Sequence, residues 1–399
     1  MTWIHRRCSV GFGLRASGLG RDRDSSPWPE ARGPWLLLAF IFPIILSAQR
    51  SPFNGLEVLP ADSNGHYRIL IGGHFHGEST NRSGYPAATL LANIDTINSL
   101  GANLFLSTGD LFMDPVNDLP RYQKAFFSKL KMPFFNAPGN HDVGDSESSR
   151  GAYYVPLSRC TSERLAEAPD VPSGTTLSDN PGRSWDYRSP IECLFLDTEL
   201  SGGITDQQFA RLNDMLDDAL SMDSCALRTL FIISHRPIWA EEDPQYSPLF
   251  QGNTRSVLGT NFQKDVYPLL EQIAKHAHVY WISGSMGGTA QSSIFFQPHA
   301  PNITFIQSAI RDEPRDALLI ADVYPDTVKW SALSLTGQKL LAPEAYDAAW
   351  WRARLGHSEG FNWKLLPYLV KTTVLHRAFW WGAGLMLLLV LLVRRLLRR

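Results

Sequence analysis

Cysteine and net charge are both scarce in this chain, and each scarcity limits what it can be. The 399 residues include 4 cysteines and carry a formal net charge of −2. With Cys8 assigned to a leader, an oxidising compartment permits one disulfide among Cys160, Cys193 and Cys225 and leaves one thiol unpaired. The near-neutral charge gives no footprint for a polyanionic partner, and hence no nucleic-acid-binding signature. A content of 44% hydrophobic and 19% charged residues is typical of a folded globular protein.

Long apolar runs are also few, and two of them stand out. The first, residues 35–48, follows a stretch with several arginines and ends in Leu-Ser-Ala, which resembles a signal-peptide cleavage site. The run predicts a signal peptide or an uncleaved signal anchor. The long arginine-containing segment before it equally suits an organelle transit peptide, or a start assigned too far upstream.

The second apolar run, residues 378–393, lies close to the C-terminus and carries no charge. Trp380 and Trp381 fall at one end, where an interfacial aromatic belt belongs, and RRLLRR follows the other end. We therefore predict a C-terminal transmembrane helix. The positive-inside rule places the basic tail in the cytoplasm, so the globular body is expected on the exported, periplasmic or extracytoplasmic side.

Between these ends, strand-like and helix-like segments alternate, which indicates an α/β (α+β) domain. The expected strands are 67–71, 103–107, 133–137, 184–187, 191–197, 229–234, 279–283, 303–308, 317–323 and 327–335. The expected helices are 86–100, 122–130, 206–220 and 266–277. The predicted organisation is a leader (1–50), one domain (60–340), a membrane-proximal linker (341–375) and a C-terminal anchor (376–399).

Four of the expected strands end in short loops that carry side chains able to bind a metal. These are, in chain order, His74 and His76, then Asp110, then Asn140, His141 and Asp142, and finally His235. Loops at the carboxyl ends of parallel strands gather in one crevice of an α/β sheet. Imidazole, carboxylate and amide oxygen together suit a divalent cation such as Zn, Mn or Fe. Each loop alone is more often an ordinary turn, so the prediction depends on all four occurring in order.

The ordered blocks resemble those of the calcineurin-like metallophosphoesterases, whose pattern is D-x-H, G-D, G-N-H-[DE], a strand-end His and G-H-x-H. The resemblance covers residues 66–338, and the GNHD block at 139–142 is its most specific part. It implies a sandwich of two mixed β-sheets flanked by helices, with a two-metal site at the strand ends. It also implies hydrolysis of phosphate esters by a metal-activated water.

The resemblance assigns a role to each site residue. His76 takes the histidine of the first block and Asp110 the carboxylate that bridges two metals. Asn140 binds the second metal, and His235 joins it. His141 stabilises or protonates the leaving oxygen, and Asp142 orients His141.

The chain departs from the family pattern at two blocks. His74 stands where the first block has aspartate, and Gly284-Ser285-Met286-Gly287 stands where the final block has two histidines. His276 and His278 lie about one strand length from the expected ligand positions, and His299, in an expected proline-containing loop, could replace a ligand only if that loop folds back. With Asp110 as the one certain carboxylate, two divalent cations would leave about three positive charges uncompensated.

A single metal held by His74, His76 and Asp110 is therefore the more economical prediction. Asn140 and His235 would then bind substrate, or bind a second metal weakly. Two functions remain open: a membrane-anchored, exported metal-dependent phosphoesterase, and a catalytically degenerate relative that acts as a tethered binding or scaffold module. The class of phosphate ester is not indicated.

Overall fold

The computed structural model describes residues 50–77, 83–143, 191–199, 204, 206–220, 227–241, 243–250, 260–285, 293–355, 363–375 and 377–398. The expected leader, the apolar run 35–48 and the expected strand 184–187 lie outside these residues, as do Cys160, Cys225, Met286 and Gly287. Cys193 is a free, buried cysteine.

The first sheet contains five strands in the order β10-β9-β1-β2-β3. They are β1 (Tyr67–Gly72), β2 (Leu104–Ser107), β3 (Phe134–Asn136), β9 (Ala317–Tyr324) and β10 (Thr327–Ser334). β1, β2 and β3 run parallel, whereas β9 is antiparallel to both β1 and β10. β9 and β10 thus form a hairpin across residues 324–326.

The second sheet also has five strands, in the order β4-β5-β6-β8-β7. They are β4 (Ile191–Phe195), β5 (Thr229–Ile233), β6 (His278–Ser283), β7 (Ser293–Ala300) and β8 (Ile303–Ala309). β4, β5, β6 and β8 are parallel, and β7 is antiparallel to β8 at the edge. β7 was not predicted.

The two sheets pack face to face, and the side-chain period of two along each strand explains the layers. In β1, Ile69 and Ile71 enter the core between the sheets, while Leu70 points to the outer face. Phe231 and Ile233 of β5 likewise face the first sheet. Both faces of these strands are buried, which is why their sequences read as continuous apolar runs.

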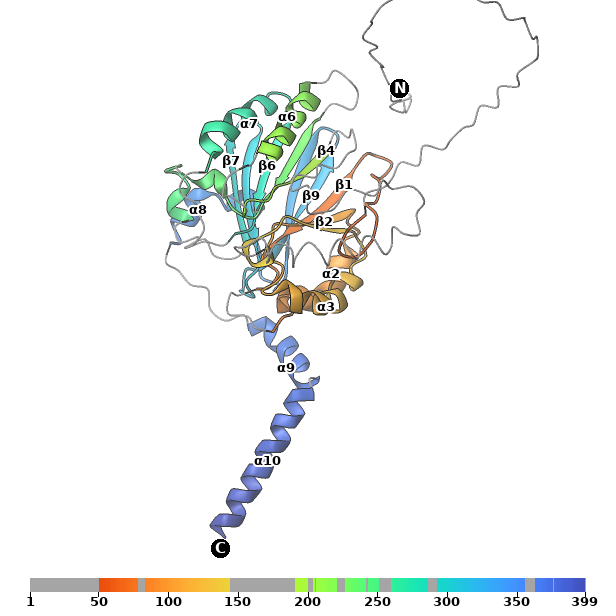
Figure 1. Ribbon diagram of the computed structural model, residues 1–399, viewed down its shortest axis with the longest axis vertical. Helices are drawn as coiled ribbons and strands as arrows, with labels where there is room; N and C mark the ends of the chain where they lie inside the picture. The colour runs from red at the N-terminus through yellow and green to blue at the C-terminus, as the bar shows by residue number, and fades with distance from the viewer. Residues whose placement is uncertain are drawn as a thin grey trace, which may run out of the picture. The chain divides into compact units, whose positions relative to one another are not determined.

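Helices cover both outer faces (Figure 1). On the first sheet lie α1 (Ala88–Ala92), α2 (Ile94–Ser99), α3 (Pro115–Ala125) and the short turn η1 (Phe127–Lys129). On the second sheet lie α6 (Asp206–Leu220), the π-helical turn η5 (Phe262–Val266) and α7 (Tyr267–Ile273). The predicted sandwich of two mixed sheets flanked by helices is therefore confirmed.

The remaining short elements are turns and helices that follow the strands. They are α4 (Asn140–Val143), η3 (Ile238–Ala240), η4 (Ser247–Leu249), η6 (Pro343–Ala345) and α8 (Ala348–Arg352). η6 and α8 pack on the edge strand β7, where the indole of Trp351 donates a hydrogen bond to the Ile294 carbonyl oxygen over 3.0 Å.

Three helical elements end the chain: η7 (Trp363–Leu365), α9 (Leu366–Leu375) and α10 (Arg377–Leu397). Among the described residues, α10 is the one helix long and apolar enough to cross a bilayer, and none of it is buried. It contains the predicted transmembrane run and is a candidate span.

Candidate metal centre

Polar side chains converge where three strands end. His74 and His76 follow β1, Asp110 follows β2, and His235 follows β5. β1 and β2 belong to the first sheet and β5 to the second, so both sheets contribute to the site. His74 and Asp110 adopt left-handed backbone conformations, with φ of 59° and 55°, which turn the chain sharply as each strand ends.

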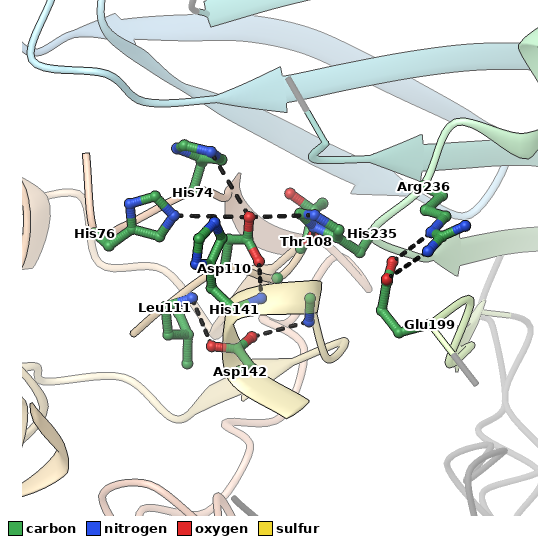
Figure 2. A network of polar contacts seen from close by, with 12 residues as sticks. His74, His76, Thr108, Asp110, Leu111, His141, Asp142, Glu199, His235 and Arg236 are labelled. Carbon is green, nitrogen blue, oxygen red and sulfur yellow. Dashed lines mark hydrogen bonds and ion pairs between the residues drawn. The ribbon is translucent and has the colours of Figure 1, made fainter. Parts of the chain in front are cut away.

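The Asp110 carboxylate lies at the centre of this cluster (Figure 2). Its Oδ2 atom is 3.7 Å from Nε2 of His74, 3.7 Å from Nε2 of His76 and 3.3 Å from Nε2 of His235. All four side chains are buried, and the most exposed of them, His74, is 6% exposed. Three imidazole nitrogens thus meet at one carboxylate oxygen inside the protein.

Burial and the electrostatic interactions among these four side chains decide which of them is ionised. Burial opposes ionisation of Asp110, but the charge and hydrogen bond of His235 and the hydrogen bond of His76 hold its pKa well below the usual range. Burial and the neighbouring His76 lower the pKa of His74 well below its usual value. His74 is consequently neutral, which is the form that binds metals.

His235 is oriented by the main chain of the neighbouring loop. Its Nδ1 atom lies 2.9 Å from the Thr108 carbonyl oxygen. Because a carbonyl can only accept, Nδ1 carries a hydrogen, and Nε2 faces Asp110. Burial disfavours the charged imidazole, yet the charge and hydrogen bond of Asp110 raise the pKa of His235 to about 9. Nε2 could bind a cation only after releasing this proton.

The GNHD loop closes the cluster from the first sheet. Asn140 begins the short helix α4, and the main-chain N–H of His141 donates to Asp110 Oδ1 over 3.0 Å. The imidazole rings of His141 and His76 lie 4.8 Å apart. The sequence-predicted residues of the second, third and fourth blocks are thereby brought to the same place as the first.

Asp142 holds two of these loops together. Its carboxylate accepts hydrogen bonds from the main-chain N–H groups of Leu111 (2.9 Å), Phe112 (3.1 Å) and Gly139 (2.9 Å), and from the side-chain amide of Asn136 (3.2 Å). Burial and the charge of Asp110 raise its pKa to about 6. Asp142 fixes the backbone on both sides of the site, including the turn that carries His141.

Two glycines allow the loops to approach so closely. A Cβ on Gly139 would lie 2.3 Å from Asp110 Oδ1 and 2.4 Å from Asp110 N. Gly109 has φ of 96°, and a Cβ there would lie 2.6 Å from His235 Nδ1. The glycines of GD and GNHD are therefore required by space as well as by turn geometry.

The donor set fits a divalent cation. One ligand atom from each of His74, His76 and Asp110 lies within 4.8 Å of the others. Nδ1 of His74 is buried and has no hydrogen-bond partner among the described residues. Two imidazoles and one carboxylate leave coordination positions for water and substrate, as in catalytic metal sites.

The strand end expected to carry the final block lies against His235. The amide of Ser285 donates to the His235 carbonyl oxygen over 2.7 Å, and Ser285 is buried. His278 begins β6 and so lies at the opposite end of that strand from Ser285. His299 lies in β7 and not in the expected loop, and its Nδ1 is 2.7 Å from the Tyr246 hydroxyl oxygen. Neither histidine joins the cluster.

A buried ion pair beside the site was missed by the sequence analysis. Arg236, directly after His235, binds the Glu199 carboxylate with two hydrogen bonds of 2.8 and 2.9 Å. It ties the loop after β5 to the loop after β4 (Figure 2). Thr108, whose carbonyl orients His235, was also missed. The adjacency of Arg236 to His235 in HRP and of Thr108 to GD was the available signal.

Comparison with known proteins agrees with this arrangement. Residues 84–267 match the family described as calcineurin-like phosphoesterase. The match covers just under half of the 399 residues, and over this segment the chain is similar to that family. The matched segment includes Asp110, the GNHD block and His235, whereas both histidines of the first block lie before it. A search of curated proteins finds no match.

Solved structures similar to this chain include two metallophosphatases. The structure of purple acid phosphatase PPD1 from yellow lupin (Lupinus luteus) seeds is 12% identical, with a TM-score of 0.48, and the match covers 72% of this chain and 54% of the lupin chain. A dimetal phosphatase from Danio rerio is 12% identical, with a TM-score of 0.44 and coverage of 69% and 98%. GAP50, the anchor in the inner membrane complex of Plasmodium, is also 12% identical, with a TM-score of 0.44 and coverage of 74% and 96%. The chain thus spans about half the length of the lupin protein.

Proposed function

We propose that this protein is a membrane-anchored, exported enzyme that hydrolyses phosphate esters with a divalent metal. The convergence of three imidazoles on the Asp110 carboxylate carries the proposal. The family match supports the phosphoesterase activity, and the candidate membrane span α10 supports the membrane anchor. The leader and the basic tail support an exported domain and a cytoplasmic C-terminus.

The first proposed ligands are His74, His76 and Asp110, which hold one cation. When bound, a Zn, Mn or Fe ion would polarise the phosphoryl group and activate water as the nucleophile. His235 faces the same carboxylate, and Asn140 lies between Gly139 and His141, whose backbone approaches Asp110. We assign Asn140 and His235 to the phosphoryl oxygens or to a weakly held second metal. One metal is preferred because, within the part of the chain that the structure describes, Asp110 is the one carboxylate that faces all three imidazoles.

His141 is the proposed proton donor to the leaving oxygen. It lies at the rim of the cluster, partly exposed, so that its ring can reach both solvent and substrate. Its main-chain N–H already fixes Asp110 Oδ1, and the adjacent Asp142 fixes the turn that positions it. A proton delivered at this point would stabilise the departing alkoxide.

The test uses the full-length chain purified under mild conditions. With Mn or Zn added, it should release phosphate from p-nitrophenyl phosphate, and Asp110→Ala should abolish that release. Asp217→Ala, which removes an exposed aspartate on α6, is the matched control and should leave the rate unchanged. Equal rates for Asp110→Ala and the unaltered chain would sink the mechanism.

A tethered binding or scaffold module is the second candidate. The observation that favours it is Ser285, which stands in place of a family histidine and offers no usual ligand. Elemental analysis separates the two candidates. About one metal per chain, lost in His74→Ala, supports the enzyme, whereas no metal and no thermal stabilisation by Mn or Zn supports the scaffold.

A further inference from the structure

Helix α9 has apolar side chains on two different sides. Leu365, just before it, is buried, and Tyr368 is half-buried against the domain. Leu366, Val370 and Val374 are 41%, 52% and 37% exposed. Their spacing of four residues places them along one side of the helix. A soluble helix would present polar residues there, so this side requires an apolar or interfacial partner.

α9 packs at the edge of the domain that carries the metal-type ligands. It contacts α1, the helix that follows the His74–His76 loop. The start of α1 and the His74–His76 loop are linked directly, because the Ala87 N–H donates to the Phe75 carbonyl oxygen over 2.7 Å. Through α1, helix α9 is therefore attached to the same part of the domain that holds the candidate metal site.

The loop after β8 provides a second connection between α9 and the site. Ile310 N–H donates to the Gly73 carbonyl oxygen over 3.0 Å, which fixes this loop beside His74. Two residues later, Asp312 accepts a hydrogen bond of 3.0 Å from Thr89 N–H in α1. Burial and the charge of Asp312 raise the pKa of Tyr368 in α9. Residues 310 and 312 of this loop thus lie beside the candidate ligand and near α9.

The membrane candidate begins where α9 ends. One residue separates α9 from α10. A helix of ten residues is about 15 Å long, so the edge of the domain that holds the site stays close to the start of the span. Lys371 and Arg377 are exposed in this region, where their long side chains can lie along apolar surface and keep their charges in water.

We infer that the apolar side of α9 rests on the bilayer surface, that the metal-ligand edge faces the membrane, and that the substrate is a phosphate ester carried by a lipid. The substrate part rests on the proposed phosphoesterase function. The orientation part rests on α9, its contacts with α1 and its continuity with α10. Cleavage of a lipid phosphomonoester transfers its phosphoryl group to water, giving inorganic phosphate and leaving the lipid alcohol in the bilayer.

The orientation is measured on the full chain in vesicles, with Cys193 kept and the other three cysteines replaced by serine. A fluorophore is attached at Tyr85→Cys, on the exposed approach to α1, or at Lys275→Cys, exposed before β6 at the opposite edge. The six residues of β6 separate the two edges by about 20 Å. Energy transfer to an acceptor-labelled lipid should be several-fold greater from position 85. Equal or reversed transfer overturns the orientation.

The role of α9 is tested by Leu366→Glu, with Leu220→Glu as control at a similarly exposed leucine that ends α6. Leu366→Glu should reduce energy transfer from position 85, and Leu220→Glu should leave it unchanged. A reduction in neither variant contradicts the contact between α9 and the bilayer.

The substrate is tested with phosphatidic acid in vesicles and with p-nitrophenyl phosphate, each with added Mn or Zn. We expect hydrolysis of both, with Asp110→Ala inactive on both. Hydrolysis of p-nitrophenyl phosphate alone overturns the lipid inference and leaves the proposed function intact. Hydrolysis of neither overturns both, and the energy-transfer result still decides the orientation.

Discussion

Gly139→Ala tests whether the site depends on close approach of the GNHD loop to Asp110. A methyl group at residue 139 would lie 2.4 Å from the Asp110 main-chain nitrogen and 2.3 Å from its Oδ1, whereas ordinary contact begins at 3.4 Å. The two loops must therefore separate by about 1 Å. Such overpacking costs about 1–3 kcal/mol of stability. A displacement of this size at a reacting group lowers the rate by about 100-fold.

The control is Gly101→Ala, which isolates the stability effect. Gly101 follows α2 with φ of 63°, and a methyl group added there would meet nothing within 4 Å, so alanine costs strain of about 1–2 kcal/mol without touching the site. Denaturant unfolding gives both stabilities. Phosphate release and metal affinity are then measured on folded protein. Wild-type metal affinity and rate in Gly139→Ala, or an equal loss in Gly101→Ala, would refute the reasoning.

Three further predictions concern buried charges. Asp142→Ala removes the acceptor of three main-chain N–H groups and should cost about 3 kcal/mol or more in denaturant unfolding; a cost below about 1 kcal/mol would contradict this role. Arg236→Leu leaves Glu199 buried and unpaired and should cost about 3–5 kcal/mol. The exposed Arg211→Leu should cost less than about 1 kcal/mol, and similar costs for both arginine variants would show that burial does not matter. Burial raises the pKa of Asp316 to about 8 from 3.8, so stability is full below about pH 4 and falls as pH rises to about 8, by at most about 1.4 kcal/mol per unit. Asp316→Asn should flatten that fall in thermal melts, and an unchanged slope would exclude Asp316 as its source.

The central strands of the sandwich were predictable because both faces of each are buried. β1 and β5 read as unbroken apolar runs, since alternate residues fill the core between the sheets and the core under the helices. β7 was missed because Pro298 and His299 interrupt its pattern. An edge strand tolerates proline, and the register shifts at that point.

Helix ends depended on contacts that a local pattern does not contain. The expected helix 86–100 divides at Asn93, whose side-chain amide donates to the Leu335 carbonyl oxygen, 242 residues away, over 2.6 Å. Its backbone leaves the helical region there, with φ of −112°. Such a break is set by tertiary structure and not by helix propensity.

At the site, residue order predicted which side chains would meet but not how they are held. The loops carrying His76, Asp110 and His235 were expected to share one edge, and they do. The Thr108 carbonyl that orients His235 and the pair between Arg236 and Glu199 come from backbone geometry and from a strand distant in sequence. Neither leaves a periodic trace in the sequence.

The left-handed backbone of His74 limits which residue types fit at that position. At φ of 59°, most side chains are strained, while glycine, asparagine, aspartate and histidine are tolerated. The aspartate of the family pattern and the histidine of this chain both belong to that short group. Histidine in place of aspartate therefore changes the charge and the donor atom of the site without requiring a different path of the chain.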